Sequence, residues 1–193
     1  MVASRSHVAY VGRVIDRLDA EAAPAAEDYG FAQFVSIPVA EAEDVVGVIY
    51  DTQLVNPEYG SLGPRLSPPA ELAVLSPDYL NEQGLLIGIL LLGWRDPARG
   101  AFHHAVPRRV IPVNQEVYRL AEEDMQGFHK DAQGHIQLHY YSQVVAHAGS
   151  FSVPLIEAII EQLEPHAAAE ERQRLCVLKQ TLVWQRTVGQ MRL

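Results

Sequence analysis

A phosphate-binding loop requires a lysine at a fixed position in its sequence motif. The chain has only two lysines, Lys130 and Lys179, and neither follows a glycine. A phosphate-binding loop needs glycine, lysine and then serine or threonine, because backbone amides hold the phosphates while the lysine neutralises their charge. The sequence therefore excludes a P-loop ATPase within these 193 residues.

The histidines are the next candidates, since their spacing suggests metal ligands. His135 and His139 lie four residues apart, and His103 and His104 are adjacent. A four-residue step brings two ligands to one ion only on a helix. The segment 135–145 alternates in a way that predicts a strand, on which four residues span about 13 Å. We therefore expect no metal site and no cofactor.

Hydrolytic chemistry would need a nucleophile beside a base. Glu122–Asp124 is a run of consecutive acidic residues, and neighbouring side chains on a helix diverge, so the run predicts a solvated face. Ser150 and Ser152 do not form a GxSxG nucleophile elbow. Cys176 stands among apolar residues, which predicts a buried, unreactive thiol. We expect no catalytic residue and a protein that is not an enzyme.

Nucleic-acid binding is the alternative that the residue types leave open. Small barrels bind single strands by stacking bases on aromatic rings above a positive groove, and Trp94, Arg95, Tyr140 and Tyr141 could supply those parts. However, 15 basic residues against 24 acidic ones give a net charge of −9. Phosphate binding favours a basic footprint, so we expect the chain alone not to bind nucleic acid.

The elements that position these residues begin with short apolar strands. Strands are predicted at 8–18, 31–39, 45–54 and 85–93, with a weaker one at 72–75. The run Leu85–Gly93 is continuously apolar, which predicts a strand covered on both faces. Gly84, Gly88 and Gly93 argue against a helix there. The glycine- and proline-rich segment 56–69 predicts an extended loop.

The second half of the chain is mixed and then helical. An extended segment is predicted at 106–113, and a short strand with a helical turn at 114–125. Ser152 is a plausible N-cap for a helix that Pro165 ends, and a second helix follows over 168–191. We expect these two helices to form an antiparallel hairpin.

The last helix carries two apolar faces. Leu175, Leu178 and Leu182 share one face, and Val177, Trp184, Val188 and Met191 lie on an adjoining one. Both faces could pack within the chain. A wide stripe with an aromatic residue beside arginine is also typical of an interface. The candidate interface residues are Leu178, Leu182, Trp184 and Arg186.

Together these elements predict an α+β protein. We expect a small closed or partly open antiparallel β-barrel over 1–112, a mixed extension over 113–150 and a helical hairpin over 151–193. The single cysteine, the lack of a signal peptide and apolar runs far shorter than the ~20 residues of a membrane helix predict a cytoplasmic protein that does not enter the membrane.

The apolar blocks also resemble a known domain. VGRVIDRL, FAQFVSIPV, VVGVIYDTQL, LLIGILLLG and VIPVNQEVYRLAEEDM, which together span about residues 8–125, resemble the HAS-barrel of HerA-type hexameric DNA translocases. That barrel is similar to the N-terminal barrel of rotary ATP synthase subunits. The likeness consists of apolar spacing with few fixed polar residues.

The resemblance implies a role for the barrel but no catalysis. In the HerA-type family the barrel helps to assemble the ring and docks a partner nuclease, and a RecA-type ATPase core follows it. Here residues 146–193 predict a helical hairpin instead, so no ATP-binding residue matches. The expected function is a protein-interaction or assembly module, linked to DNA processing or repair. Its partner would be a translocase, a nuclease or a second copy of the chain. The alternative is a small-barrel module that binds single strands.

Overall fold

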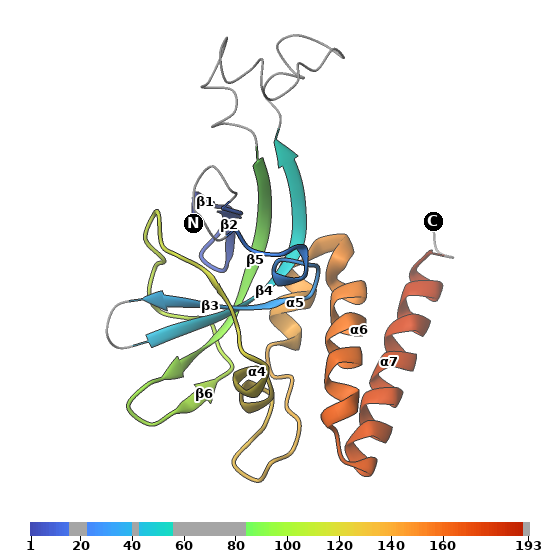
Figure 1. The fold of residues 1–193 in the computed structure, drawn as a ribbon. Helices are drawn as coiled ribbons and strands as arrows, with labels where there is room; N and C mark the ends of the chain where they lie inside the picture. Colours follow the sequence, from blue (N-terminus) through green and yellow to red (C-terminus); the bar gives the residue numbers. More distant parts are fainter. Residues whose placement is uncertain (16–22, 40–42, 56–83, 191–193) are drawn as a thin grey trace, which may run out of the picture.

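The computed structural model describes residues 1–15, 23–39, 43–55 and 84–190, with only the backbone described at 183 and 185–190. The fold is α+β, with a seven-stranded antiparallel sheet followed by a helical C-terminal part (Figure 1). The strands are β1 (Ala3–Ser4), β2 (Ala9–Arg13), β3 (Phe34–Val39), β4 (Glu43–Val55), β5 (Gly84–Asp96), β6 (Ala101–His103) and β7 (Tyr118–Arg119). The helices are α4 (Glu122–Phe128), α5 (Tyr141–His147), α6 (Ser152–Leu163) and α7 (Ala169–Gln190), with 3-10 turns η1 (Ala26–Asp28), η3 (Gly149–Phe151) and η4 (Glu164–His166).

The strand order places β5 at the centre of the sheet. The path is β1-β2-β5-β4-β3-β7, and β6 also pairs with β5. One edge of β5 pairs with β4, while β2 and β6 share its other edge at Leu86–Leu90 and Trp94–Asp96. The strands predicted at 31–39, 45–54 and 85–93 are confirmed, and the first strand is shorter than the predicted 8–18. The predictions for 56–69 and 72–75 lie outside the described residues.

The middle of the sheet is covered on both faces. Ile89–Leu92 are consecutive in β5 and fully buried, as the continuous apolar run predicts. Two register shifts interrupt the pairing of β4 with β5, between Val46 and Gly47 and between Ile49 and Asp51. Such bulges bend a strand and increase its twist, so the sheet curves around its own apolar side chains.

Gly93 permits the close approach of β6 to β5. A Cβ atom at this position would lie 2.0 Å from the carbonyl oxygen of His103 and 3.0 Å from the ring of Phe128. No side chain fits at that distance, so glycine is required here for steric reasons rather than for an unusual backbone angle.

The described strands form an open sheet, so among the residues that the structure describes the closed form of the predicted barrel is not found. Its outer strands, β1 and β7, do not pair with each other. The segment before β7 runs beside the N-terminal edge instead: the amide of Asn114 donates to the carbonyl of Met1 at 2.9 Å, and the Met1 amine donates to the carbonyl of Gln115 at 2.6 Å. The amide of Ile111 also donates to the hydroxyl of Tyr10 at 3.3 Å.

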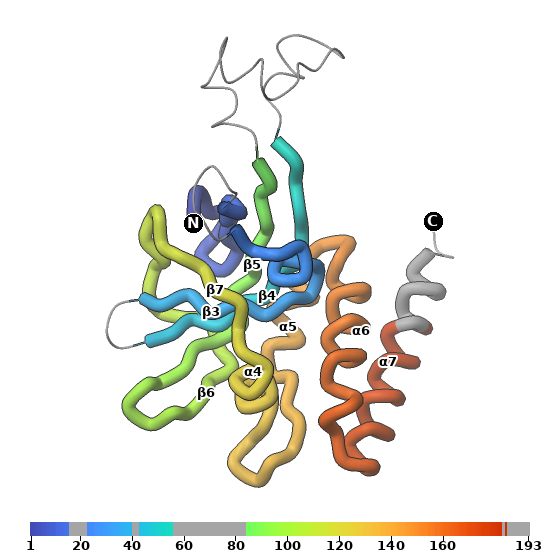
Figure 2. Tube along the Cα trace, in the orientation of Figure 1, coloured from blue at the N-terminus to red at the C-terminus, as the bar shows by residue number. Residues whose placement is uncertain are grey.

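The C-terminal helices form layers on one side of the sheet. α5 contacts β5, α6 contacts α5, and α7 contacts α6. α6 and α7 lie side by side and antiparallel, with α7 at the periphery of the molecule (Figure 2). The predicted helices are therefore confirmed, although Ser152 is the first residue of α6 and no side chain caps that helix.

The predicted strand at 135–145 is wrong. Its first half is irregular, with one isolated bridge between Lys130 and Ile136, and its second half belongs to α5. The buried residues Tyr140 and Val144 are four apart, which is a helical spacing. Burial against α6 and β5 therefore decides the conformation of this segment, because the local alternation is too short to do so.

Candidate functional site

α7 has one face inside the protein and one face in solvent. Leu175 and Leu182 are buried, Leu182 with only 1% of its surface exposed. On the other side Val177 is 57% exposed and Trp184 is 66% exposed. These two residues are seven apart in sequence, about two helical turns, so they form one line along the helix. We call Val177 and Trp184 the α7 stripe.

The predicted interface residues fall into different environments. Leu178 is half-buried, Leu182 is in the core and Trp184 is exposed. The backbone of Arg186 is described, but its side chain is not. Only Trp184 among the three described side chains is therefore largely available to a partner.

Cys176 corrects another prediction, because its side chain is exposed rather than buried. The residue follows the buried Leu175, and each step along a helix turns the side chain by about 100°. An apolar neighbour in sequence is therefore not a neighbour on the same helix face.

A groove lies on the side of α7 that carries Leu175 and Leu178, and neither residue of the α7 stripe lines it. Its volume is about 210 Å³, well above the space that one water molecule needs. It is lined by Ile136, Leu138, Glu171, Arg174, Leu175 and Leu178. The segment 136–138 forms one wall and α7 forms the other, so the groove depends on how that segment is held against the helix.

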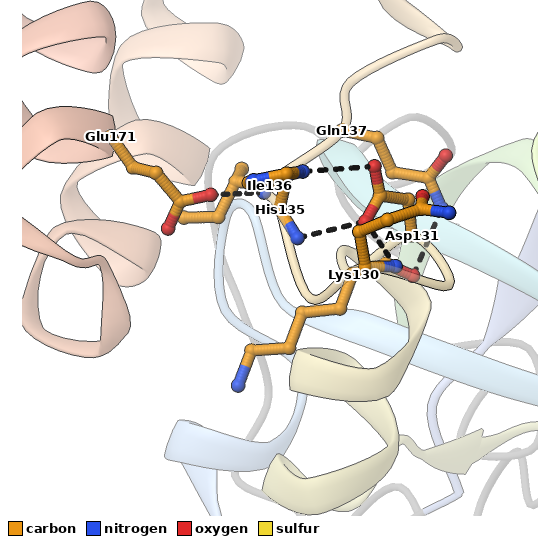
Figure 3. A network of polar contacts seen from close by, with 7 residues as sticks. Lys130, Asp131, His135, Ile136, Gln137 and Glu171 are labelled. Carbon is orange, nitrogen blue, oxygen red and sulfur yellow. Dashed lines mark hydrogen bonds and ion pairs between the residues drawn. The ribbon is translucent and has the colours of Figure 1, made fainter.

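Glu171 joins the two walls (Figure 3). Its Oε1 accepts the amide of Ile136 at 2.6 Å, and its Oε2 accepts the amide of Ala168 at 3.2 Å. The second bond satisfies one of the free amides at the start of α7, as in a capping box. The amide of Ile136 is the main cause that lowers the pKa of this carboxyl. Glu171 is therefore ionised near neutral pH and binds both walls at once.

The wall segment is also fixed by its own turn. Asp131 Oδ1 accepts the amides of Gln133 at 2.9 Å and His135 at 2.8 Å, and Gly134 has a positive φ of 83°. The side-chain amide of Gln137 donates to the carbonyl of Lys130 at 3.1 Å (Figure 3). This network gives the groove a wall that does not need a partner to be formed.

A buried histidine, His129, adjoins the segment 136–138 that forms the groove wall, because its carbonyl accepts the amide of Gln137. His129 Nδ1 is 2.7 Å from the carbonyl of Met125, and its Nε2 is 2.7 Å from the hydroxyl of Tyr140. A carbonyl only accepts, so Nδ1 carries the proton and Nε2 accepts from Tyr140. Burial lowers the pKa of His129 to about 3. The ring is therefore neutral, and its hydrogen bonds attach the end of α4 to the start of α5.

His104 is a second neutral histidine in contact with this core. Its Nε2 is 2.7 Å from the carbonyl of Phe128, and burial lowers its pKa to about 4. The rings of His104 and His139 lie 5.8 Å apart. No sequence spacing points to this arrangement, because His104 comes from the segment after β6. The described residues contain no group of three or more His, Cys, Asp or Glu that could hold a metal ion.

The predicted base-stacking set is not assembled. Tyr140 is 2% exposed, so no base can stack on it. Trp94 stacks on His103 with the ring centres 5.2 Å apart. Arg95 lies over Phe102 at 5.5 Å and pairs with Asp124 at 3.3 Å.

The hollow beside Arg95 has mixed charge. It has a volume of about 170 Å³, and its lining includes Arg95, Arg119, Asp44 and Asp124. Arg119 pairs with Asp28 at 3.0 Å. A carboxylate accompanies each of these arginines, so the hollow does not form the positive groove that a nucleic-acid strand requires.

Comparison with known proteins places the chain in a family. Among the described residues, no helix has both the length and the apolarity to cross a membrane. A search of the curated proteins finds no match to this sequence. Residues 1–192 match the family described as Domain of unknown function (DUF8166), and the chain therefore belongs to that family.

Proposed function

We propose that this chain is a non-catalytic protein-interaction module that docks a protein partner on the α7 stripe. The observation that carries the proposal is the exposure of Trp184, 66%, in line with Val177 on a helix whose opposite face is buried. Tryptophan is enriched among residues that dominate interface energies.

The groove on the other side of α7 supports the same function. Its walls are joined by Glu171, and Leu175 and Leu178 line the α7 wall. A preformed site loses less conformational entropy when a partner binds. A partner that contacted this side of α7 would therefore meet a preformed recess that offers both apolar and charged side chains.

The HAS-barrel resemblance suggests the wider setting of this module. We infer a partly open barrel, and the hydrogen bonds between Met1 and residues 114–115 support that inference by bridging the two edges of the sheet. A cytoplasmic assembly role beside a DNA translocase or nuclease would follow from the resemblance. The single-strand-binding alternative lacks a supporting observation, because Tyr140 is in the core.

The test compares two exposed apolar residues. Trp184→Ala should abolish recovery of the partner in a pull-down from the source cells, or self-association measured by size-exclusion chromatography with light scattering. Val110→Ala is the matched control, because Val110 is 68% exposed but lies outside α7. A wild-type chain that is strictly monomeric and recovers no partner would contradict the proposal.

A further inference from the structure

The groove between α7 and the segment 136–138 combines apolar side chains with one exposed charge. Leu175 is its most buried apolar residue, with 5% of its surface exposed, while Ile136, Leu138 and Leu178 are half-buried. The groove has a volume of about 210 Å³, and a cavity of about 150 Å³ already holds a benzene molecule. The groove is therefore large enough for one apolar side chain of another protein.

The two charged residues of the groove are not equally available to a ligand. Glu171 is buried, with 9% of its surface exposed, and its two carboxylate oxygens accept the amides of Ile136 and Ala168 (Figure 3). Arg174 is exposed and makes no hydrogen bond or ion pair with any residue that the structure describes. A cation in the groove would have to compete with two amides for Glu171, whereas an anion would find the guanidinium of Arg174 open to solvent. The groove therefore favours a negatively charged ligand.

The spacing along α7 defines this ligand further. Arg174 and Leu178 are four residues apart, so their Cβ atoms lie about 6 Å apart on one side of the helix. A ligand that contacts both must offer a carboxylate and an apolar side chain at a similar distance. Residues three or four apart on a helix meet this requirement, and residues two apart on a strand meet it at about 7 Å. A short peptide segment can therefore carry the whole pattern.

We propose that the groove binds an acidic and apolar segment of a partner protein, with one apolar side chain over Leu175 and Leu178 and a neighbouring carboxylate paired to Arg174. This inference rests on the proposed function, because it gives the chemistry of a partner that docks on α7. The net charge of −9 does not prevent such a contact, since physiological salt largely screens exposed charges that lie more than about 8 Å away.

Selection of short random peptides on the full chain tests the class of ligand. The wild-type chain should enrich peptides in which Asp or Glu lies within about four residues of Leu, Ile, Met or Phe. Arg174→Glu should instead enrich peptides in which Lys or Arg takes the acidic place. Arg99→Glu is the matched control, because this arginine is also exposed but lies in the turn between β5 and β6. It should select the same peptides as the wild-type chain.

Fluorescence anisotropy with the strongest labelled peptide measures the contact with Arg174. Arg174→Glu should weaken binding by about tenfold, since it replaces an exposed ion pair by a like-charge pair. The same peptide with its acidic residue changed to lysine should bind Arg174→Glu more tightly than it binds the wild-type chain, and misfolding of the variant could not produce this rescue. No enriched peptide, enriched peptides without an acidic residue, or no rescue by the charge reversal would each overturn the proposal.

Trp184→Ala separates this inference from the proposed function. A peptide in the groove should bind Trp184→Ala as tightly as the wild-type chain, because Trp184 does not line the groove. A peptide whose binding is lost in Trp184→Ala but kept in Arg174→Glu lies on the α7 stripe. In that case the groove inference is wrong and the interaction function stands. A peptide that neither variant affects lies elsewhere and contradicts the inference.

Discussion

β5 and α7 are both rich in apolar residues, but they use them differently. In β5 the consecutive residues Ile89–Leu92 are all buried, since neighbouring elements cover both faces of the strand. In α7 Leu182 is buried while Trp184, two residues later, is 66% exposed. The apolar side chains of β5 therefore stabilise the fold. The helix buries one apolar face in the fold and leaves Val177 and Trp184 exposed to solvent.

The sharpest test of this division compares two residues of one helix. Leu182→Ala should lower the free energy of unfolding by about 2–5 kcal/mol, because it removes buried contacts and leaves a cavity. Trp184→Ala should change it by less than about 0.5 kcal/mol, as is usual for a surface position. Urea unfolding measures both free energies. Equal losses would show that α7 has no free face.

Gly93 tests the dependence of the sheet on close packing. Gly93→Ala should destabilise the protein by about 1–3 kcal/mol, the usual cost of overpacking a core, because its Cβ would overlap the carbonyl of His103. Gly30→Ala is the control, since no atom lies within 4 Å of the Cβ that it would add. Thermal or urea unfolding distinguishes them, and a Gly93→Ala variant as stable as the control would contradict the packing argument.

The buried histidines predict that the free energy of unfolding depends on pH. The α7 stripe contains no histidine and should not contribute to this dependence. Burial lowers the pKa from 6.5 to about 3 in His129 and to about 4 in His104. Between those values the unfolded chain binds protons that the folded chain does not, so stability falls as the pH drops below about 6.5. The loss is at most about 1.4 kcal/mol per pH unit for each histidine.

Urea titrations between pH 7 and 5 measure this slope above the range in which ordinary carboxyl groups titrate. The slope of the unfolding free energy against pH reports how many more protons the unfolded chain binds than the folded chain. His129→Gln should lower that difference by up to one proton, because it removes one buried neutral histidine. The wild-type chain measured in parallel is the control. An unchanged slope in His129→Gln would mean that this ring is not held neutral by burial.

The smallest expected effect is local and concerns the groove. Glu171→Gln removes one of two carboxylate oxygens that accept amides, so at least one of the amides of Ile136 and Ala168 loses its acceptor. Amide hydrogen exchange should become faster at these positions while the sheet is unaffected. Glu170→Gln, at the neighbouring exposed position, should change neither. Protection that stays unchanged in Glu171→Gln would show that the groove walls are held by other contacts.

Local periodicity explains which elements could be predicted. The unbroken apolar run of β5 requires cover on both faces, and the spacing of Leu175, Leu178 and Leu182 separates one face of α7 from that of Val177 and Trp184. The same periodicity could not show which face is covered. That depends on contacts with α6, so the sequence alone places both Leu182 and Trp184 among the candidate interface residues.

The sequence by itself determined the strands β3, β4 and β5, the helical C-terminus and the absence of a P-loop motif, because these depend on neighbouring residues and their spacing. Only the tertiary structure decided the helix at 141–147, the open edge of the sheet and the bond of Glu171 to Ile136. The hydrogen bond between His129 and Tyr140 was also decided by the tertiary structure. Each of these depends on contacts between elements, and the free energy of burial there outweighs the weak preferences of the local chain.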